Sequence, residues 1–270
     1  MVVQHNIAAL NSNRQVGINN IGAAKSMEKL SSGFRINRAG DDAAGLTISE
    51  KMRSQVKGLN QATRNAQDGI SLIQTAEGAL SETHNILQRM RVLADQSANG
   101  TNTADDRAAI KQEVDQLVEE IDRIATTTQF NTQNLLDGTA TGIELQIGAN
   151  KDQKLSFAIA NMDKTGLGVD SVDVATASGS QDAIATLDTA IKTVSTQRSA
   201  LGAVQNRLEH TISNLSTSAE NLTAAESRIR DTDMAAEMLE YTKNNILAQA
   251  SQSMLAQANQ RPQSVLQLLG

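Results

Sequence analysis

The chain has 270 residues, a formal net charge of −6, no cysteine and one proline. An acidic balance argues against a nucleic-acid-binding protein, which relies on basic surface, and the lack of cysteine excludes disulfides and cysteine-based metal sites. Aromatic residues contribute only 1%, so the chain is poorly supplied to line a small-molecule pocket, whereas scarce proline and abundant aliphatic side chains favour long packed helices.

The first residues show no targeting segment. Residues 1–6 have neither a basic start nor an apolar run, so we expect no Sec-type signal peptide. No stretch approaches the ~18 apolar residues that a membrane span needs. These features are compatible both with the cytoplasm and with export of an unfolded chain by another route.

Residues 5–32 predict a weak amphipathic helix. Its apolar residues stand among many Asn, Ser and Gln, and they are Ile7, Leu10, Ile18, Ile21, Met27 and Leu30. This segment offers too little apolar surface to be stable alone, because isolated helices are marginal in water. We therefore expect it to pair with another part of the chain or with another copy.

Residues 31–46 (SSGFRINRAGDDAAGL) predict an irregular polar connector. Three glycines interrupt helix continuation, and they are Gly33, Gly40 and Gly45. Side chains of opposite charge lie near one another for local ion pairing, and they are Arg35, Arg38, Asp41 and Asp42. An ordinary polar loop would explain the same residues.

Residues 72–93 and 110–124 predict a hairpin of two helices. Apolar positions step by four and three in both segments, and they include Leu72, Ala76, Ala79, Ile86, Met90, Leu93, Ile110, Val114, Leu117, Ile121 and Ile124. Turn-forming residues fill 97–103, and Thr103 with Asp106 resembles a capping box at the start of the second helix. Unrelated helices are the alternative.

The region from 128 to 180 differs in character. Ile143–Ile147 and Leu155–Ile159 alternate apolar and polar residues around a turn-forming stretch at 148–153, which predicts a β-hairpin. Asp163–Gln181 is rich in Gly, Ser, Thr and Asp and predicts a surface loop.

Residues 184–222 carry the strongest pattern in the chain. Twelve positions follow spacings of three and four without interruption, namely Ile184, Leu187, Ile191, Val194, Arg198, Leu201, Gln205, Leu208, Ile212, Leu215, Ala219 and Leu222. A heptad seam of this length predicts a coiled-coil-like helix about 60 Å long. The fold class is therefore mainly α, an antiparallel helical bundle with a small β-hairpin.

Residues 234–269 predict a second weak helix like that of 5–32. Its apolar residues include Met238, Leu239, Ile246, Leu247, Met254 and Leu255 in a Gln-rich background. The two ends of the chain are expected to pair with each other or with other copies and to order on assembly.

Four segments resemble the bacterial flagellins, in the order in which that family has them. Residues 31–46 resemble the N-terminal signature, and 67–80 (QDGISLIQTAEGAL) resemble the start of the main core helix. Residues 225–233 (AESRIRDTD) resemble the C-terminal junction, and 258–269 (ANQRPQSVLQLL) the terminal segment. The resemblance covers residues 1–135 and 180–270.

The resemblance implies a domain organisation. Residues 1–33 and 234–270 would form inner-tube terminal helices, a second coiled-coil domain packed through Ile7, Leu10, Ile21, Leu247, Met254 and Leu255. Residues 34–45 would form a spoke connector that uses Phe34, Arg35, Arg38, Asp41 and Asp42. Residues 46–180 and 181–233 would form the core domain, and the outer variable domains of larger flagellins would be absent.

The resemblance also implies a function and partners. The chain would polymerise with itself into the extracellular flagellar filament, after export through the flagellar secretion apparatus without a cleaved signal peptide. An export chaperone, the filament cap and hook-junction proteins would be further partners, with no nucleic acid and no membrane. A hook–filament junction protein is the alternative function, and an adhesin or receptor ligand is a rival from another class.

A receptor contact follows from the resemblance as well. Residues 87–99 resemble a flagellin surface that Toll-like receptor 5 of animals senses, with Arg89, Leu93 and Glu113 as central contacts. Arg89 and Leu93 are four residues apart on one helical face. Packing between subunits would explain the same patch.

No catalytic or cofactor-binding set is expected. The three histidines, His5, His84 and His210, are far apart and none belongs to a His-Glu-x-x-His arrangement. The methionines suit helix packing better than metal binding. We therefore expect no enzyme, no cofactor and no metal site.

Overall fold

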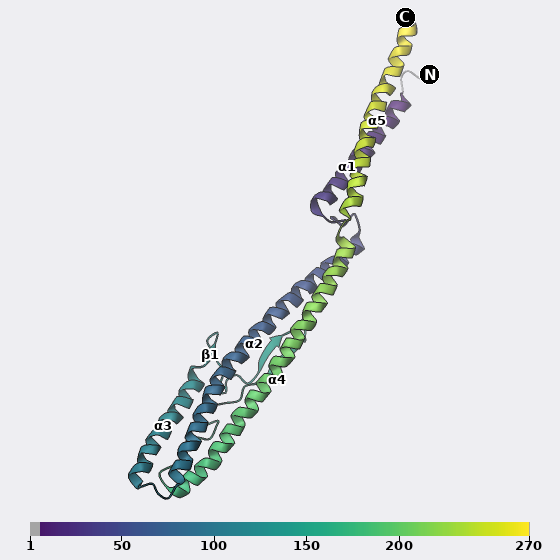
Figure 1. The fold of residues 1–270 in the computed structure, drawn as a ribbon. Helices are drawn as coiled ribbons and strands as arrows, with labels where there is room; N and C mark the ends of the chain where they lie inside the picture. The colour runs from purple at the N-terminus through teal and green to yellow at the C-terminus, as the bar shows by residue number, and fades with distance from the viewer. Residues whose placement is uncertain (1–5, 270) are drawn as a thin grey trace. The chain divides into compact units, whose positions relative to one another are not determined.

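The computed structural model describes residues 6–269, with the side chains of residues 6–261. The mainly α prediction is confirmed (Figure 1). The helices are α1 (Ile7–Ser32), α2 (Ala43–Ala98), α3 (Ala104–Thr127), α4 (Ala177–Arg230) and α5 (Met234–Leu269), and the strands are β1 (Gln129–Phe130), β2 (Gln133–Asn134), β3 (Ile143–Gln146) and β4 (Lys154–Phe157). The chain divides into two compact units, one of Met1–Ser54 with Glu220–Gly270 and one of Gln55–Ala219.

The unit of residues 55–219 is a bundle of α2, α3 and α4 around one apolar core (Figure 1). All twelve predicted seam positions of α4 are buried or half-buried. The same holds for the predicted apolar steps of α2 and α3, with Met90, Val114 and Ile121 fully buried. The periodicity of the sequence therefore identified the faces that pack together.

One of the two polar members of the α4 seam, Arg198, finds a partner on α2. The guanidinium of Arg198 lies 3.6 Å from the carboxylate of Glu77, with both side chains about one-third exposed. A seam position can accept a charged residue where its long side chain reaches the edge of the helix pair. The break in the apolar pattern is thus an ion pair between two helices.

The start of α3 is capped as expected. The Asp106 N–H donates to Oγ1 of Thr103 at 3.3 Å, and the Thr103 N–H donates to Oδ2 of Asp106 at 2.9 Å. The Thr103 hydroxyl, and then its main-chain N–H, hold the pKa of Asp106 below its ordinary value. The capping box fixes where the chain re-enters a helix after the turn.

Two β-hairpins lie between α3 and α4. The predicted one is confirmed, as β3 and β4 pair antiparallel with Ile143 opposite Phe157. The other, β1 with β2, was missed because its strands have two residues each. Its turn residues Asn131 and Thr132 have φ of 49° and 64°, as a type I′ turn requires.

The segment before α4 differs from the predicted surface loop. Helix α4 already begins at Ala177, where Thr176 Oγ1 accepts a hydrogen bond from the Gly179 N–H at 3.0 Å. Val169 and Val174 are fully buried in the core of the bundle, and the Ser97 hydroxyl donates to the Val174 carbonyl at 2.6 Å. The polar composition of this segment gave no sign that its valines belong to the core.

Candidate assembly surface and connector

Helices α1 and α5 pack against each other antiparallel through small and polar residues (Figure 1). The buried positions of the pair are Asn19, Ser26, Ala248 and Ala258. The Asn19 amide donates to the Ser251 hydroxyl at 3.0 Å, and Gly22 leaves room for the side chain of Asn244. A close, polar contact of this kind buries little apolar surface within one chain.

Most large apolar side chains of the same two helices are exposed and lie outside their contact. Exposed ones are Ile7, Leu10, Ile18, Ile21, Met27, Met234, Met238, Leu239, Ile246, Leu247 and Met254. Ile21 and Leu239 are 69% and 73% exposed. Of the six residues predicted to pack in the inner tube, Leu255 alone is half-buried in the single chain. We call this set of exposed side chains the apolar terminal surface.

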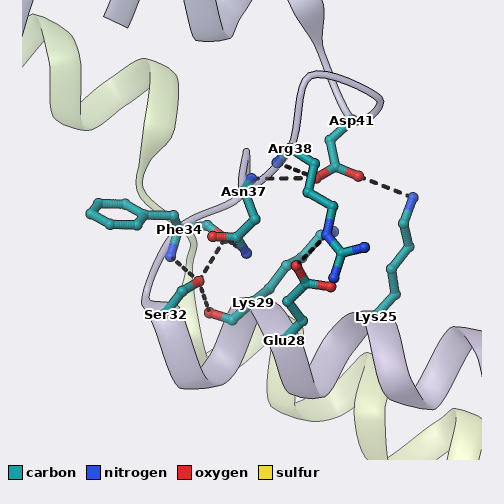
Figure 2. Close-up of polar contacts among 8 residues, drawn as sticks. All are labelled: Lys25, Glu28, Lys29, Ser32, Phe34, Asn37, Arg38 and Asp41. Carbon is teal, nitrogen blue, oxygen red and sulfur yellow. Dashed lines mark hydrogen bonds and ion pairs between the residues drawn. The ribbon is translucent and has the colours of Figure 1, made fainter. Parts of the chain in front are cut away.

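The connector after α1 begins with a helix cap (Figure 2). Gly33 adopts a left-handed φ of 73°, and its N–H donates to the Lys29 carbonyl at 2.8 Å. The Ser32 hydroxyl accepts a hydrogen bond from the Phe34 N–H at 3.1 Å. Glycine suits this position because left-handed backbone strains other residues.

The charged side chains of the connector pair differently from the prediction (Figure 2). Arg38 Nε lies 2.9 Å from the Glu28 carboxylate, and Lys25 Nζ lies 3.1 Å from Asp41. Asp41 also accepts the main-chain N–H groups of Asn37 and Arg38, at 3.3 and 3.1 Å. The expected pairing of arginines with aspartates inside the loop was wrong, because the acidic and basic partners come from the preceding helix.

These contacts define the charge state of Asp41. The main-chain N–H of Arg38 contributes most, and the Lys25 side chain next, to a pKa below the ordinary value. A carboxylate that accepts several N–H groups is stabilised in its ionised form. Asp41 thus holds the turn of the connector together through main-chain N–H groups and ties it to α1 through the Lys25 side chain.

The connector is shorter than predicted, because α2 already begins at Ala43. The Gly45 N–H donates to Oδ1 of Asp42 at 2.9 Å, so Asp42 caps the helix. Gly45 lies inside α2 and does not interrupt the helix, contrary to the prediction. A Cβ at Gly45 would lie 2.8 Å from Cδ1 of Ile36, so glycine serves close packing here rather than a break.

Phe34 joins the connector to the end of α4. It forms an antiparallel bridge with Asp231, flanked by the Arg35 N–H donating to the Arg230 carbonyl at 2.7 Å and the Thr232 N–H donating to the Gly33 carbonyl at 3.0 Å. The Arg35 guanidinium donates to the Ile229 carbonyl. Two segments almost 200 residues apart are therefore held at one place.

Two guanidinium groups lie over the Phe34 ring. The Cζ atoms of Arg230 and Arg53 are 4.5 and 5.8 Å from its centroid. Arg53 also pairs with Glu226 at 3.0 Å, and Nε of Arg230 has no hydrogen-bond partner among the described residues, as suits a guanidinium stacked on a ring. Sequence reasoning missed Arg53, Glu226 and Arg230, although the segment 225–233 had been singled out.

The predicted receptor residues lie on the bundle. Arg89 Nη2 and the Glu113 carboxylate are 2.8 Å apart, with side chains 54% and 45% exposed. Leu93 is only 2% exposed and belongs to the core beneath. The structure thus brings Arg89 and Glu113 together at the surface and places Leu93 below it.

Neither a metal site nor a membrane span is found among the described residues. Within residues 6–269, no three His, Asp or Glu side chains gather where a metal ion could bind. Over the same part of the chain, no helix has the length and apolarity that crossing a membrane requires.

Comparison with known proteins identifies the family. Residues 3–141 match the family model for the bacterial flagellin N-terminal helical region, and residues 184–269 match the one for the C-terminal helical region. The chain belongs to the bacterial flagellin family. The resemblance of the sequence motifs is thereby confirmed.

Individual relatives agree with the family match. A flagellin of Halalkalibacterium halodurans is 60% identical over 271 residues, with 100% of both chains covered. The flagellar filament 31.3 kDa core protein of Treponema maltophilum is 52% identical over 285 residues, again with 100% of both chains covered. The crystal structure of Bacillus cereus flagellin matches with a TM-score of 0.51 and 37% identity, over 60% of this chain and 94% of that one.

The family also decides the question of enzymatic activity. Flagellins are structural proteins and not enzymes, so the prediction of a non-enzymatic chain is confirmed by its relatives. The short form predicted from the sequence agrees with the flagellin of H. halodurans, to which the chain aligns from end to end.

Proposed function

We propose that the chain is the subunit of a flagellar filament, and that burial of the apolar terminal surface between copies drives its assembly. The observation that carries the proposal is the inverted burial pattern of α1 and α5. These helices bury Asn19 and Ser26 and expose Ile21 and Leu239. A stable monomeric domain places such residues the other way round. The family relationship supports the same reading, since one relative is named a filament core protein.

The energetics favour coupling between assembly and ordering. Full burial of one Leu or Ile side chain contributes about 1.5–3 kcal/mol, and eleven large apolar side chains of the terminal surface are exposed in the single chain. Ordering the backbone costs roughly 1–2 kcal/mol per residue, so the terminal helices gain most when neighbours cover them. Polymerisation then stabilises the helices that it needs.

A charge placed on the apolar terminal surface tests the proposal. Ile21→Asp puts a carboxylate where neighbouring copies would bury an isoleucine, whereas Asn20→Asp adds the same charge one residue away on the exposed side chain of Asn20. With filament seeds and a sulfate salt, which strengthens apolar burial, the control is expected to form tubes and Ile21→Asp is not. Equal polymerisation of both variants, seen by electron microscopy, would overturn the proposal.

The same images separate the filament subunit from a hook–filament junction protein. A filament subunit adds to its own copies without limit, so long uniform tubes are expected. A junction protein occupies a few positions and would leave the seeds at their original length. The end-to-end match to a flagellin favours the subunit.

Motility, export and the remaining partners belong to the same proposal. The filament would be extracellular and would serve swimming, and the chain would leave the cell through the flagellar secretion apparatus without losing a signal peptide. An export chaperone, the filament cap and junction proteins would be its binding partners during export and assembly. Complementation of a strain that lacks its flagellin, scored by swimming and by the N-terminal sequence of shed filaments, tests these steps.

The exposed pair of Arg89 and Glu113 supports a role for the monomer as a ligand of Toll-like receptor 5. Both side chains are available at the surface, and Leu93 shapes the helix face from inside the core. Arg89→Ala is expected to lower the response of receptor reporter cells, whereas Lys111→Ala, which removes an exposed ion pair with Asp115 on the same helix as Glu113, leaves it unchanged. A full response to the Arg89 variant would exclude this contact.

A further inference from the structure

The turn between α2 and α3 contains the only Asn-Gly pair of the chain, Asn99–Gly100. We propose that Asn99 is a self-modification site, at which the main-chain nitrogen of Gly100 attacks the side-chain amide and converts the residue to aspartate and isoaspartate. The reaction uses water and no other reagent. It moves the formal net charge of −6 one unit further negative.

The steps balance without oxidation or reduction. The Gly100 nitrogen gives up its proton and forms a bond to Cγ of Asn99, while the bond from Cγ to Nδ2 breaks and ammonia leaves. The five-membered succinimide ring then adds water at either carbonyl. Opening at one restores a normal main chain with aspartate, and opening at the other passes the main chain through Cβ and Cγ.

The geometry leaves both reacting groups free. Asn99 and Gly100 are exposed and lie after the last residue of α2, Ala98. The described residues provide no acceptor for the Gly100 N–H, and no atom lies within 4 Å of the place a Cβ would take. Oδ1 of Asn99 accepts a hydrogen bond from the Thr101 N–H at 3.4 Å, so the side chain already folds toward the residues that follow it.

Arg107 assists as a positioning residue. Its Nη2 donates to the Asn99 carbonyl at 3.1 Å, and its Nε donates to the Ser97 carbonyl at 3.0 Å, which holds the guanidinium in place. A cation at this carbonyl draws electrons from the peptide group and makes the Gly100 N–H easier to deprotonate. On the isoaspartate route the same carbonyl becomes the new carboxylate, with Arg107 as its counter-ion.

The two Asp-Gly pairs of the chain do not meet the requirements of this reaction. Asp68–Gly69 lies inside α2, where the helix restrains the main chain. Asp137–Gly138 could undergo the same reaction, but the Asp137 side chain is held in place. Its carboxylate accepts hydrogen bonds from the Thr139 hydroxyl at 2.6 Å and from the Asn134 amide at 2.8 Å. The Thr139 hydroxyl does most to lower the pKa of Asp137, and an ionised carboxylate has no leaving group for the attack.

The new charge would weaken the turn in one respect and preserve it in another. A carboxylate at the carboxyl end of α2 opposes the helix dipole, while attraction to Arg107 keeps that side chain near. The isoaspartate product also lengthens the main chain within a tight turn. Subunits that have aged would therefore differ from new ones at this turn.

Peptide mapping of the purified full-length chain tests the proposal. During incubation at mildly alkaline pH, the fragment of residues 92–107 is expected to gain aspartate and isoaspartate at Asn99 several-fold faster than fragments report it at Asn131, whose neighbour is Thr132. Gly100→Ala should slow the conversion several-fold, because a methyl group hinders the attack. Conversion at Asn99 no faster than at Asn131 would overturn the proposal.

The role of Arg107 is tested by the sign of its effect. Arg107→Gln should slow the conversion and lower the share of isoaspartate, with Arg107→Lys restoring part of the rate. A purely structural role predicts the opposite, since a loosened turn cyclises more easily. A faster reaction in Arg107→Gln would assign Arg107 to holding the turn and would remove it from the proposal.

Discussion

The α2–α4 bundle and the α1–α5 pair are both built from long helices, yet they bury opposite kinds of residue. The bundle encloses its aliphatic seam, with Leu87, Val194 and Leu208 fully buried. The pair encloses Asn19 and Ser26 and leaves its isoleucines, leucines and methionines outside. The bundle is therefore satisfied within one chain, whereas the proposed assembly would complete the pair with neighbouring copies. Assembly can then be switched by ordering the ends without disturbing the bundle.

Deletion of α5 gives the largest effect that this comparison predicts. A chain that ends at Asp233 should form no filaments under any of the conditions used for the full chain, because half of the apolar terminal surface is gone. The bundle of residues 55–219 has its own core, so its thermal unfolding should be unchanged. Electron microscopy and circular dichroism measure the two properties, and tubes from the shortened chain would contradict the division of roles.

A pair of leucine substitutions sharpens the contrast. Leu208→Ala removes a fully buried side chain and should lower the free energy of unfolding of the bundle by about 2–5 kcal/mol. Leu239→Ala, at a 73% exposed position, should change the stability of the monomer by no more than about 0.5 kcal/mol.

The exposed leucine should instead matter for assembly. Leu239→Ala is expected to raise the critical concentration for polymerisation about tenfold, since roughly 1.4 kcal/mol of burial per subunit is lost. Denaturant unfolding and sedimentation of polymer give the two numbers. An unfolding free energy lowered by several kcal/mol in Leu239→Ala would mean that its side chain packs within the monomer.

The difference between the two regions also explains what the sequence could predict. The bundle was foreseen in detail, because a packed seam such as Leu187 to Leu215 requires spacings of three and four that are visible in the sequence. The end helices were foreseen as helices that pair with each other or with other copies, but the residues of their contact were not, since Asn19, Gly22 and Ser251 carry no hydrophobic signal. A contact made by such residues leaves no periodic pattern in the sequence.

The position of the connector was predicted from the sequence, but the partners of its side chains were not. Glycine at 33 and the capping aspartate at 42 are local signals, and both act within a few residues. Arg53 and Arg230 meet Phe34 only because α2 and α4 bring distant positions to one ring. Local charge proximity suggested Asp41 as a partner for arginine, whereas the preceding helix supplies Lys25 instead.

Phe34→Leu should loosen the joint between the connector and α4 by a moderate amount. The variant keeps an apolar side chain but removes the ring under Arg230 and Arg53, with a loss of about 0.5–1 kcal/mol for each cation–π contact at a partly exposed site. Amide exchange at Arg35 and Thr232, which form the flanking main-chain bonds, should become faster. Phe34→Tyr retains the ring and serves as the control, so equal exchange in both variants would exclude a role for the ring.

The smallest expected effect is the dependence of the connector on pH. Because the pKa of Asp41 is lowered in the folded chain, its contribution to stability is present above the ordinary carboxyl pKa of about 3.9. That contribution is lost as the pH falls through the folded value, when protonation releases the Arg38 and Asn37 N–H groups and Lys25. The protection of these amides, which is the slowing of their exchange relative to an unfolded chain at the same pH, should therefore fall in acid before the bundle responds.

Lys25→Met separates the two causes of the lowered pKa. The main-chain N–H of Arg38, which has the larger influence, remains in this variant, so the pKa of Asp41 should rise only part of the way to the ordinary value. Asp41→Asn removes the titration and should make the protection of the Arg38 N–H, relative to an unfolded chain at the same pH, insensitive to acid in this range. An Asp41 pKa at the ordinary value in the unaltered chain, measured by NMR titration of its carboxyl carbon, would show that the turn does not hold its carboxylate in solution. The connector would then depend on Phe34 and its two arginines for its order.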